Sequence, residues 1–477
     1  MKRFVNQSLL NPANFTLPIV SFAPYVFQLI MQITFARYLS VEHVSIYAAI
    51  NIFLLIILGI SNTLADKYII VTKEISDESI DRIFTIELLF SIFIFTIVYL
   101  FLKDAFIDFI DIEYLGIFWL LAACLICFYN PLSRTKAILE KEKNFIFAFL
   151  PLFIAHIISA CVAIYLLEKG FGVWAMIGWR FLIYFLEIII LFLFSSYRPK
   201  INLKVGFKDF LIFSYPIYFV SILSIFFTNL DYLILVTIVG EERLGIYWMA
   251  FSLSHIILSI RDIIQKILLP NLASQSSNLE RNIFFIRFIN QILFIMLFSL
   301  IFVTYIGDDL VLFLLGEKWK EASILFVILF YAAITKFFLS IFGSYLISIN
   351  QSFDTLPISI IQGLISIILL PLGLIFFNIV GLTIAVFLSS LITLFYIERK
   401  YLRAYLGKEI LRPALILGLN IFILMLCFYS LNASSVNFLL KISLMTAHLL
   451  FIFLFFKNEL FNLFSSLTNE TKSNTST

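Results

Sequence analysis

Few ionisable residues lie inside the long apolar stretches of this chain, and these few are its candidates for binding chemistry. Arg180 and Glu187 share one stretch and lie seven residues apart, so two helical turns would place them on one face, about 10 Å apart. Lys336, Asp231 and His255 lie in three other stretches. A charge within hydrocarbon is costly and usually serves a function. The arginine and the lysine could bind an anion through charge-assisted hydrogen bonds.

Structural roles compete with this interpretation at each position. Arg180 could instead pair with the carboxylate two turns along its own helix. Asp231 could support gating or ion coupling, or it could make a polar contact between helices. His255 and His156 could titrate near neutral pH, but packing is the more common role of such residues. Glu87 lies close to the end of an apolar stretch, where snorkelling or surface pairing would account for it.

The composition of the chain predicts which secondary-structure elements contain these residues. Of the 477 residues, 62% are hydrophobic and only 13% are charged, whereas about a quarter of a soluble domain is charged. Apolar segments of about 20 residues, the length that crosses a hydrocarbon layer about 30 Å thick, recur along the chain. We therefore expect an all-α membrane protein with about 14 transmembrane helices. The expected spans are 15–36, 43–65, 83–102, 115–133, 146–167, 173–195, 210–236, 244–268, 284–306, 322–348, 356–377, 381–398, 411–431 and 437–456.

Basic residues set the expected orientation of these spans. Lys and Arg gather in alternate connecting segments, from Lys2 and Arg3 at the start to the run between Arg399 and Arg412, and few lie in the segments between. Because basic residues favour the cytoplasmic side, both termini are expected there. Residues 1–15 lack the continuous apolar core and the cleavage site of a signal peptide, so the first span is expected to be retained.

Two stretches 200 residues apart repeat one pattern: an apolar helix, a short charged turn, and Ile-Tyr opening the next apolar helix. Without gaps, ten of the 41 positions from 20 to 60 match their partners, Tyr47 with Tyr247 among them. Such a match predicts an internal duplication. Six spans separate the copies, so both have one orientation, as in parallel-repeat transporters. The expected parts are two six-helix halves (1–205 and 206–405), an extra helix pair (406–465) and a disordered polar tail (466–477).

Prolines interrupt the leading span of each predicted half. Pro18 and Pro24 lie in the first span, and Pro216 lies in the seventh. Proline removes a backbone hydrogen bond and kinks a helix. The two spans are therefore expected to bend and to open and close a central cavity, unless the kinks are purely structural.

Several motifs resemble one known family. The stretch FARYLSVEHVSIYAA, its twin NLDYLILVTIVGEERLGIYWMAF, and the Ile-Leu-Leu-Pro sequence that ends at Pro270 are similar to the polysaccharide-biosynthesis flippases of the O-antigen type. GFGVWAMIGWRF at 170–181 and FNIVGLTIAVFLSSLI at 377–392 look like further helix starts of that family. One departure is Ser45, where the family and the second copy, at Gly245, favour glycine. The family belongs to the multidrug, oligosaccharidyl-lipid and polysaccharide exporter superfamily.

The resemblance implies a fold and a function. The fold would be MATE-like, with two six-helix bundles around a central cavity and a C-terminal helix pair. The protein would be a transporter that turns an undecaprenyl-diphosphate-linked oligosaccharide, an O-antigen or capsule repeat unit, across the bacterial inner membrane by alternating access. Arg180 and Lys336 would then bind the diphosphate, with Asp231, His255 and Glu187 as further cavity candidates. Membrane lipids, a polysaccharide polymerase and a chain-length regulator are the implied partners.

Two other functions remain open at this stage. An ion-coupled multidrug exporter of the same superfamily would favour acidic over basic cavity residues. A membrane polysaccharide polymerase would need a sizeable outer loop, and the predicted outer turns are short. No Walker A pattern is present, and the CxxC of Cys124 and Cys127 lacks further Cys or His residues to complete a metal site. No metal, cofactor or nucleic acid is therefore expected.

Overall fold

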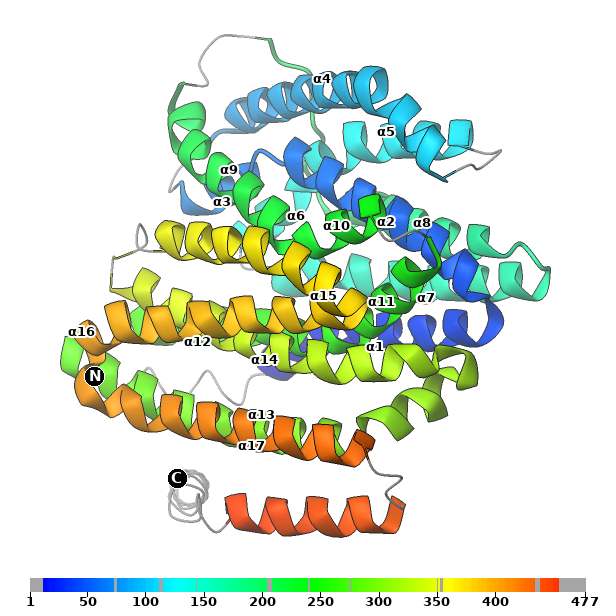
Figure 1. The fold of residues 1–477 in the computed structure, drawn as a ribbon. Helices are drawn as coiled ribbons and strands as arrows, with labels where there is room; N and C mark the ends of the chain where they lie inside the picture. The colour runs from blue at the N-terminus through cyan, green and yellow to red at the C-terminus, as the bar shows by residue number, and fades with distance from the viewer. Residues whose placement is uncertain are drawn as a thin grey trace. The chain divides into compact units, whose positions relative to one another are not determined.

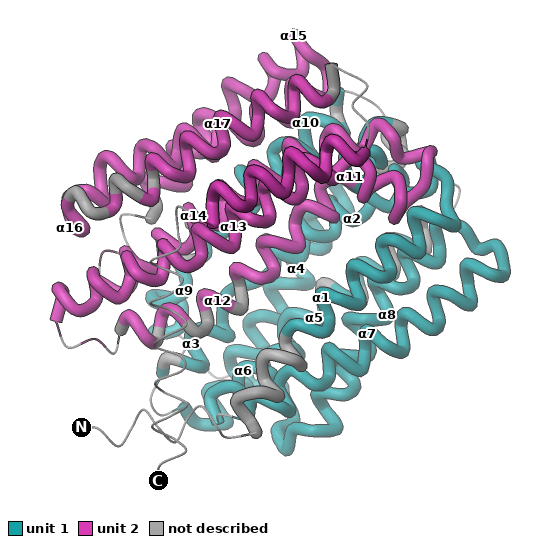
Figure 2. The backbone as a smooth tube through the Cα atoms, turned by 90° about the horizontal axis from the view of Figure 1, so that it is seen from below, with its two compact units in different colours: residues 1–249 teal, residues 250–477 magenta. Residues whose placement is uncertain are grey.

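The structure is a computed structural model that describes most of the chain. The described residues are 12–72, 75–110, 115–142, 144–203, 208–238, 241–273, 275, 277–349, 351, 355–433 and 438–453. They form helices joined by turns, and no strand occurs among them. The chain divides into two compact units, residues 1–249 and 250–477 (Figure 2).

Unit 1 is a set of helices in which neighbours along the chain often pack together (Figure 1). The helix pair α7 and α8 forms a hairpin, α1 packs against α7, and α2 packs against α4, α5, α8 and α9. The helices are α1 (Pro12–Tyr38), α2 (Val41–Ser61), α3 (Ala65–Val71), α4 (Asp77–Ile110), α5 (Leu115–Leu132), α6 (Arg134–Lys141), α7 (Phe145–Glu168), α8 (Val173–Phe194), α9 (Lys208–Thr228), α10 (Leu230–Ile238) and α11 (Glu241–Ser254), which crosses the unit boundary.

Local sequence explains where some of these helices begin and end. Ser40 precedes α2, and its side chain accepts a hydrogen bond of 3.3 Å from the backbone nitrogen of His43, which satisfies a donor that the helix start leaves open. Gly170 and Gly172 form the turn between α7 and α8 with φ values of 80° and 57°. Glycine adopts positive φ without the strain that a Cβ would add. This tight turn keeps the chain between the two helices short.

The seventh and eighth expected spans are each interrupted. The first of them divides into α9 and α10 at Asn229, and the second into α11 and α12 at His255. At both breaks a side chain reaches the backbone four residues earlier: Asn229 Nδ2 donates to Ile225 O at 2.7 Å, and His255 Nδ1 lies 3.0 Å from Phe251 O. Polar side chains that bond to the backbone compete with the helix and bend it. Apolar composition alone does not reveal such breaks.

Unit 2 contains the remaining helices. Helix α14 packs against α12, α13 and α15, and α13 also packs against α17. The elements are α12 (Ile256–Ala273), α13 (Asn278–Leu315), η1 (Glu317–Trp319), α14 (Lys320–Ser348), α15 (Thr355–Ile397), η3 (Glu398–Leu402), α16 (Arg403–Leu406), η4 (Gly407–Ile410), α17 (Leu411–Ala433) and a final helix, Phe438–Phe453.

Helix α15 contains a sharp turn where the sequence separates two expected spans. Phe377 and Asn378 have non-helical backbone angles, and Asn378 has a positive φ of 57°. Gly373 and Gly381 meet across this turn, because a Cβ added at Gly373 would lie 2.3 Å from the Gly381 carbonyl oxygen. Glycine at both positions allows this close approach. The element α15 is therefore two helical segments that meet at the boundary between two expected spans, 356–377 and 381–398.

Eight helices among the described residues are long and apolar enough to cross a membrane, and two shorter apolar helices lie near the C-terminus. The longest of the eight, Pro357–Leu406, includes both segments of α15. The expectation of an all-helical membrane protein is therefore confirmed. The number of fourteen spans stays a prediction, as do the four expected domain ranges.

Two positions related by the 200-residue offset touch each other within unit 1. The backbone nitrogen of Gly245 donates a 3.0 Å hydrogen bond to Ser45 Oγ, and a Cβ at Gly245 would lie 2.3 Å from that oxygen. Nearby, Tyr47 and Trp248 pack edge to face with ring centroids 5.2 Å apart. Residues related by a two-fold axis meet when they lie on it, but the internal repeat itself stays a prediction. The contact explains why glycine is retained at one of the two positions when the other carries serine.

Candidate functional site

Arg180 lies in α8 without a carboxylate partner among the described residues. Its guanidinium carbon is 5.0 Å from the centre of the Tyr184 ring, in a cation–π contact one turn along the helix. The residue is partly exposed, but its Nε is buried and has no hydrogen-bond partner in the described part of the chain. A cation in an apolar helix is thus held by an aromatic face rather than by an opposite charge.

Tyrosines surround this guanidinium. Tyr129 of α5 packs edge to face on Tyr184 with ring centroids 4.5 Å apart. Tyr47 of α2, which is only 3% exposed, lies within electrostatic range of Arg180, as does Tyr129. Phenols and aromatic faces stabilise a cation without neutralising it. Three helices therefore build a setting in which Arg180 keeps its charge available.

Glu187 pairs with Lys136, a residue that the sequence analysis did not connect with it. Its side chain is 1% exposed, and Lys136 of α6 donates to Oε1 at 3.2 Å while Tyr129 donates to Oε2 at 3.1 Å. The alternative in which Glu187 pairs with Arg180 is therefore not what the structure shows. Two turns of helix separate the two side chains by about 10 Å, too far for an ion pair. Lys136 reaches the carboxylate because the chain folds α6 against α8.

His156 of α7 interacts with Trp179 and with Arg180 of α8. Its ring is 6.1 Å from the ring of Trp179, and the imidazole interacts electrostatically with Arg180. The residue is 5% exposed, and its Nδ1 has no hydrogen-bond partner among the described residues. The expected packing role agrees with the burial and with the contact to Trp179, although one ring nitrogen stays unsatisfied.

Asp231 makes a polar contact between two helices. Tyr247 of α11 donates a 2.5 Å hydrogen bond to Oδ2 of this residue in α10, and the backbone nitrogen of Tyr232 lies 3.0 Å from Oδ1. The aspartate is 3% exposed and Tyr247 is fully buried. The structural alternative for Asp231, a helix–helix contact, is thus present. The sequence did not predict that its partner is Tyr247, the residue that matches Tyr47 at the 200-residue offset.

The other two predicted charges belong to unit 2. His255 occupies the break between α11 and α12, where it stacks on Phe251 with ring centroids 3.4 Å apart. Lys336, in α14, is partly exposed and interacts electrostatically with His255. Arg180, Glu187 and Asp231 thus belong to unit 1 and make separate contacts there, whereas His255 and Lys336 interact with each other in unit 2. Whether they bind substrate stays a prediction.

The gating prolines lie in continuous helices. Helix α1 runs through Pro18 and Pro24 without a break, and α9 runs through Pro216. Pro24 is buried, whereas the side chains of Pro18 and Pro216 lie outside the described residues. The breaks occur elsewhere, at Asn229 and between α11 and α12. Gating by these prolines stays a prediction.

Another arginine, which is buried, forms a network that the sequence did not predict. Arg134, at the start of α6, donates from Nε and Nη2 to the two oxygens of Glu87, both at 2.7 Å. Its Nη2 also donates to Asn62 Oδ1 at 2.9 Å, and Nη1 lies 3.4 Å from Asp66 Oδ1. Thr63 donates to the same Glu87 carboxylate. The network joins α4, α6 and the connection between α2 and α3.

Burial and charge have opposite effects on this network. Arg134 is 4% exposed and Glu87 is fully buried. Burial lowers the pKa of the Arg134 guanidinium, but the carboxylates of Glu87 and Asp66 outweigh it and raise that pKa above its usual value. The expected snorkelling or surface pairing of Glu87 is wrong, because its partner comes from a helix 47 residues later in the chain.

Metal chemistry finds no support in the part of the chain that the structure describes. No group of three or more His, Cys, Asp or Glu residues there could hold a metal ion. Cys127, Cys161 and Cys427 form no disulfide among the described residues. The side chain of Cys124 lies outside the described residues, so the CxxC motif is described only in part.

Several solved structures of transporters share this fold. A lipid II flippase, MurJ, in an inward closed conformation has a TM-score of 0.70 and 16% sequence identity, over 94% of this chain and 100% of that chain. An inward-facing multidrug resistance MATE family transporter of the MOP superfamily has a TM-score of 0.54 and 14% identity, over 84% and 94%. A mutant MATE transporter of Vibrio cholerae has a TM-score of 0.54 and 14% identity, over 82% and 95%.

These likenesses establish the fold, and the sequence establishes the family. No curated protein matches the sequence. The fold of the solved transporters and the eight apolar helices together indicate a multi-pass membrane protein. Residues 34–324, more than half of the chain, match the model of one family, described as Polysaccharide biosynthesis protein. The chain therefore belongs to the polysaccharide biosynthesis protein family.

Proposed function

We propose that the protein is a flippase that moves an undecaprenyl-diphosphate-linked oligosaccharide, an O-antigen or capsule repeat unit, across the bacterial inner membrane. The observation that carries this proposal is the setting of Arg180. This cation lies in an apolar helix, has aromatic neighbours, and has no carboxylate partner among the described residues. A diphosphate that enters a low-dielectric site needs charge-assisted donors, and a guanidinium can bind it with two parallel hydrogen bonds. The family match and the fold shared with a lipid II flippase support this choice.

The buried acids argue against an ion-coupled multidrug exporter. Glu187 accepts hydrogen bonds from Lys136 and Tyr129. Asp231 accepts a hydrogen bond from Tyr247, and Glu87 forms an ion pair with Arg134. A carboxylate that already accepts hydrogen bonds from a cation or a phenol is a poorer site for a cationic drug. The proposal therefore favours an anionic substrate.

Other parts of the proposal extend to unit 2 and to the course of transport. Lys336 is proposed as a second cation for the diphosphate, with His255 beside it. Transport is proposed to occur by alternating access, with both termini in the cytoplasm and with bending of the helices that contain Pro18, Pro24 and Pro216. A polysaccharide polymerase and a chain-length regulator are the proposed partners.

The test in cells combines deletion of the gene with complementation. Without the protein, lipid-linked repeat units should accumulate on the cytoplasmic leaflet and surface glycan should be lost. Arg180→Ala should fail to restore display at normal protein level, and Arg180→Lys should restore part of it. Phe185→Leu, at a position of the same helix that is 59% exposed, is the matched control and should restore display fully. Normal display with Arg180→Ala would overturn the assigned role.

A binding test separates the flippase from its alternative. Purified protein should bind undecaprenyl diphosphate more tightly than undecaprenyl monophosphate. Arg180→Ala should weaken diphosphate binding by about 10- to 150-fold, the equivalent of about 1.5–3 kcal/mol for a hydrogen bond to a charged group. Tight binding of cationic drugs with no preference for diphosphate would favour the multidrug exporter instead.

A further inference from the structure

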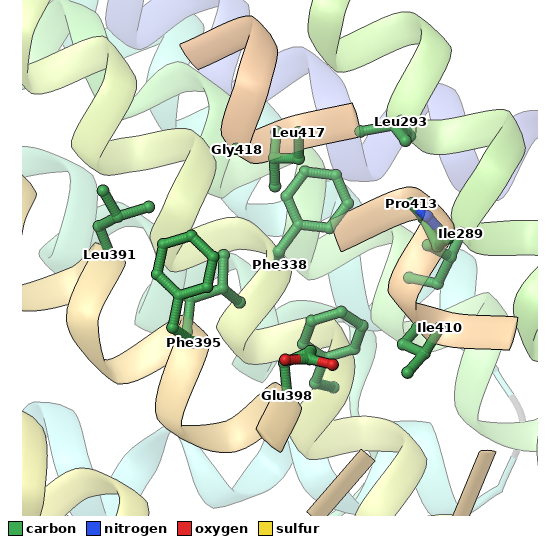
Figure 3. Close-up of a pocket in the computed structure, with 12 residues that line it drawn as sticks. Ile289, Leu293, Phe338, Leu391, Phe395, Glu398, Ile410, Pro413, Leu417 and Gly418 are labelled. Carbon is green, nitrogen blue, oxygen red and sulfur yellow. The ribbon is translucent and has the colours of Figure 1, made fainter. Parts of the chain in front are cut away.

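A pocket in unit 2 has no part in the proposed transport step. It lies between the second segment of α15 and α17, over a floor made by α13 and α14 (Figure 3). Leu391 and Phe395 come from α15, Leu417 and Gly418 from α17, and Phe338 from α14. Glu398 is the one charged residue among the pocket's lining side chains. The pocket is thus an apolar slot with a charge at one end.

Phe395 covers the side of the slot that faces away from the helix bundle. Its ring is 47% exposed, and a Cβ added at Gly418 would lie 3.4 Å from Phe395 Cζ, in ordinary van der Waals contact. The floor behind this ring is closed, because Phe338 and Leu293 are each 1% exposed. Rotation of one phenylalanine would therefore open the slot to the bilayer between α15 and α17. With the ring in its present position the space behind it holds little more than a water molecule, so a hydrocarbon chain would enter only as the ring turns aside.

The charged end of the slot carries a surplus of positive charge. Glu398 begins η3, a π-helical turn, and Arg403 binds both of its carboxylate oxygens at 2.8 and 3.4 Å. Arg399 and Lys400 follow it in the same turn and are exposed. Residues 398–412 contain five basic and two acidic residues. With Glu398 neutralised by Arg403, the remaining cations are left to attract an anion.

We propose that this slot binds one acyl chain of an anionic phospholipid, whose headgroup phosphate lies against Arg399 and Lys400. Basic clusters at the ends of membrane helices bind anionic headgroups, each Lys or Arg contributing about 1 kcal/mol near the surface. A phospholipid fits better than an isoprenyl lipid, because a straight acyl chain passes between Phe395 and Gly418 more easily than a chain with repeated methyl branches. The site lies in unit 2, whereas the Arg180 cluster lies in unit 1, so the proposal does not depend on the proposed transport.

The test measures lipid binding directly. Purified, delipidated full-length protein is titrated with phosphatidylglycerol or phosphatidylcholine of identical acyl chains, and bound lipid is counted by native mass spectrometry. Phosphatidylglycerol should bind more tightly. The double variant Arg399→Gln and Lys400→Gln should weaken its binding by about 25-fold, at about fivefold for each cation removed, and leave phosphatidylcholine unchanged. Equal binding of the two lipids to the unaltered protein would overturn the proposal.

The slot itself is tested by filling it. Gly418→Trp should remove most of the phosphatidylglycerol binding, whereas Leu419→Trp, at the next residue and 60% exposed, should leave it unchanged. Equal effects of the two variants would place the lipid elsewhere on α17 and overturn the site. A phosphatidylglycerol with a photoreactive acyl chain, used on the unaltered protein, should label peptides of α15 and α17. Displacement of that label by undecaprenyl phosphate at lower concentration than by phosphatidylglycerol would overturn the choice of lipid.

Discussion

Two arginines of unit 1 lie in opposite electrostatic settings. Arg134 binds both oxygens of Glu87 and lies close to Asp66, whereas Arg180 meets the ring of Tyr184 and has no carboxylate partner among the described residues. A buried cation whose charge is matched by a carboxylate holds helices together, because removing either partner leaves a charge in a poor solvent. A cation held by an aromatic face keeps its charge for a ligand. The difference separates a structural arginine from the one that is proposed to bind the substrate.

Loss of Arg134 should have the largest effect on stability. Arg134→Met leaves Glu87 buried without its cation, which costs about 3–5 kcal/mol. Unfolding of the purified protein by denaturant in detergent measures this cost. The double variant Arg134→Met and Glu87→Leu should recover most of the loss, because it removes both charges. If the single variant unfolds like the unaltered protein, the network is not structural.

Loss of Lys136 should have a smaller effect. Lys136→Met leaves Glu187 with only the hydrogen bond from Tyr129, and an incompletely satisfied buried group costs about 1–3 kcal/mol. The same unfolding assay measures it, with Lys136→Arg as the charge-retaining control. A cost near zero would show that Glu187 finds another cation. If that cation is Arg180, this arginine would have a carboxylate partner and would no longer differ from Arg134.

The start of α4 offers a pH-dependent contact. Tyr197 donates a 2.6 Å hydrogen bond to Asp81 Oδ1. Burial and this hydrogen bond raise the pKa of the Tyr197 phenol. Since the folded state disfavours the phenolate, the contribution to stability is complete below the unfolded pKa of about 10 and is lost as pH rises above it.

Tyr197→Phe should therefore cost about 1 kcal/mol at neutral pH, the net value of one hydrogen bond. The difference between the variant and the unaltered protein should shrink as pH rises above about 10. Unfolding midpoints across this pH range measure the effect. Phe substitution of the exposed Tyr215 is the control and should leave the pH dependence as it is. A difference that stays constant with pH would contradict the assigned contact.

Loss of Arg180 should have the smallest effect on stability. Arg180→Ala removes a cation–π contact worth about 0.5–1 kcal/mol and breaks no ion pair among the described residues. The expected result is a small change in unfolding together with the loss of diphosphate binding. A stability loss as large as that of Arg134→Met would end the distinction between the two arginines.

Sequence patterns found the residues of the candidate site better than their partners. Arg180 and Glu187 stood out because charges are rare in apolar segments, and the two-turn spacing suggested that they pair. In the structure Glu187 instead forms an ion pair with Lys136. In the sequence Lys136 was only one of the basic residues that mark a connecting segment. Arg134 and Glu87 were likewise each visible but not as a pair. Partners on different helices depend on tertiary packing, which no local pattern reports.

The sequence by itself determined that this is a helical membrane protein and where its rare charges lie. Apolar length and the low fraction of charged residues suffice for that, because a bilayer demands long apolar helices whatever their packing. Only the tertiary structure decided that Ser45 meets Gly245, that Lys136 binds Glu187, and that Glu87 neutralises Arg134. Those outcomes depend on distances of a few ångströms between helices far apart in the chain. An opposite charge neutralises a buried cation only at such a short distance.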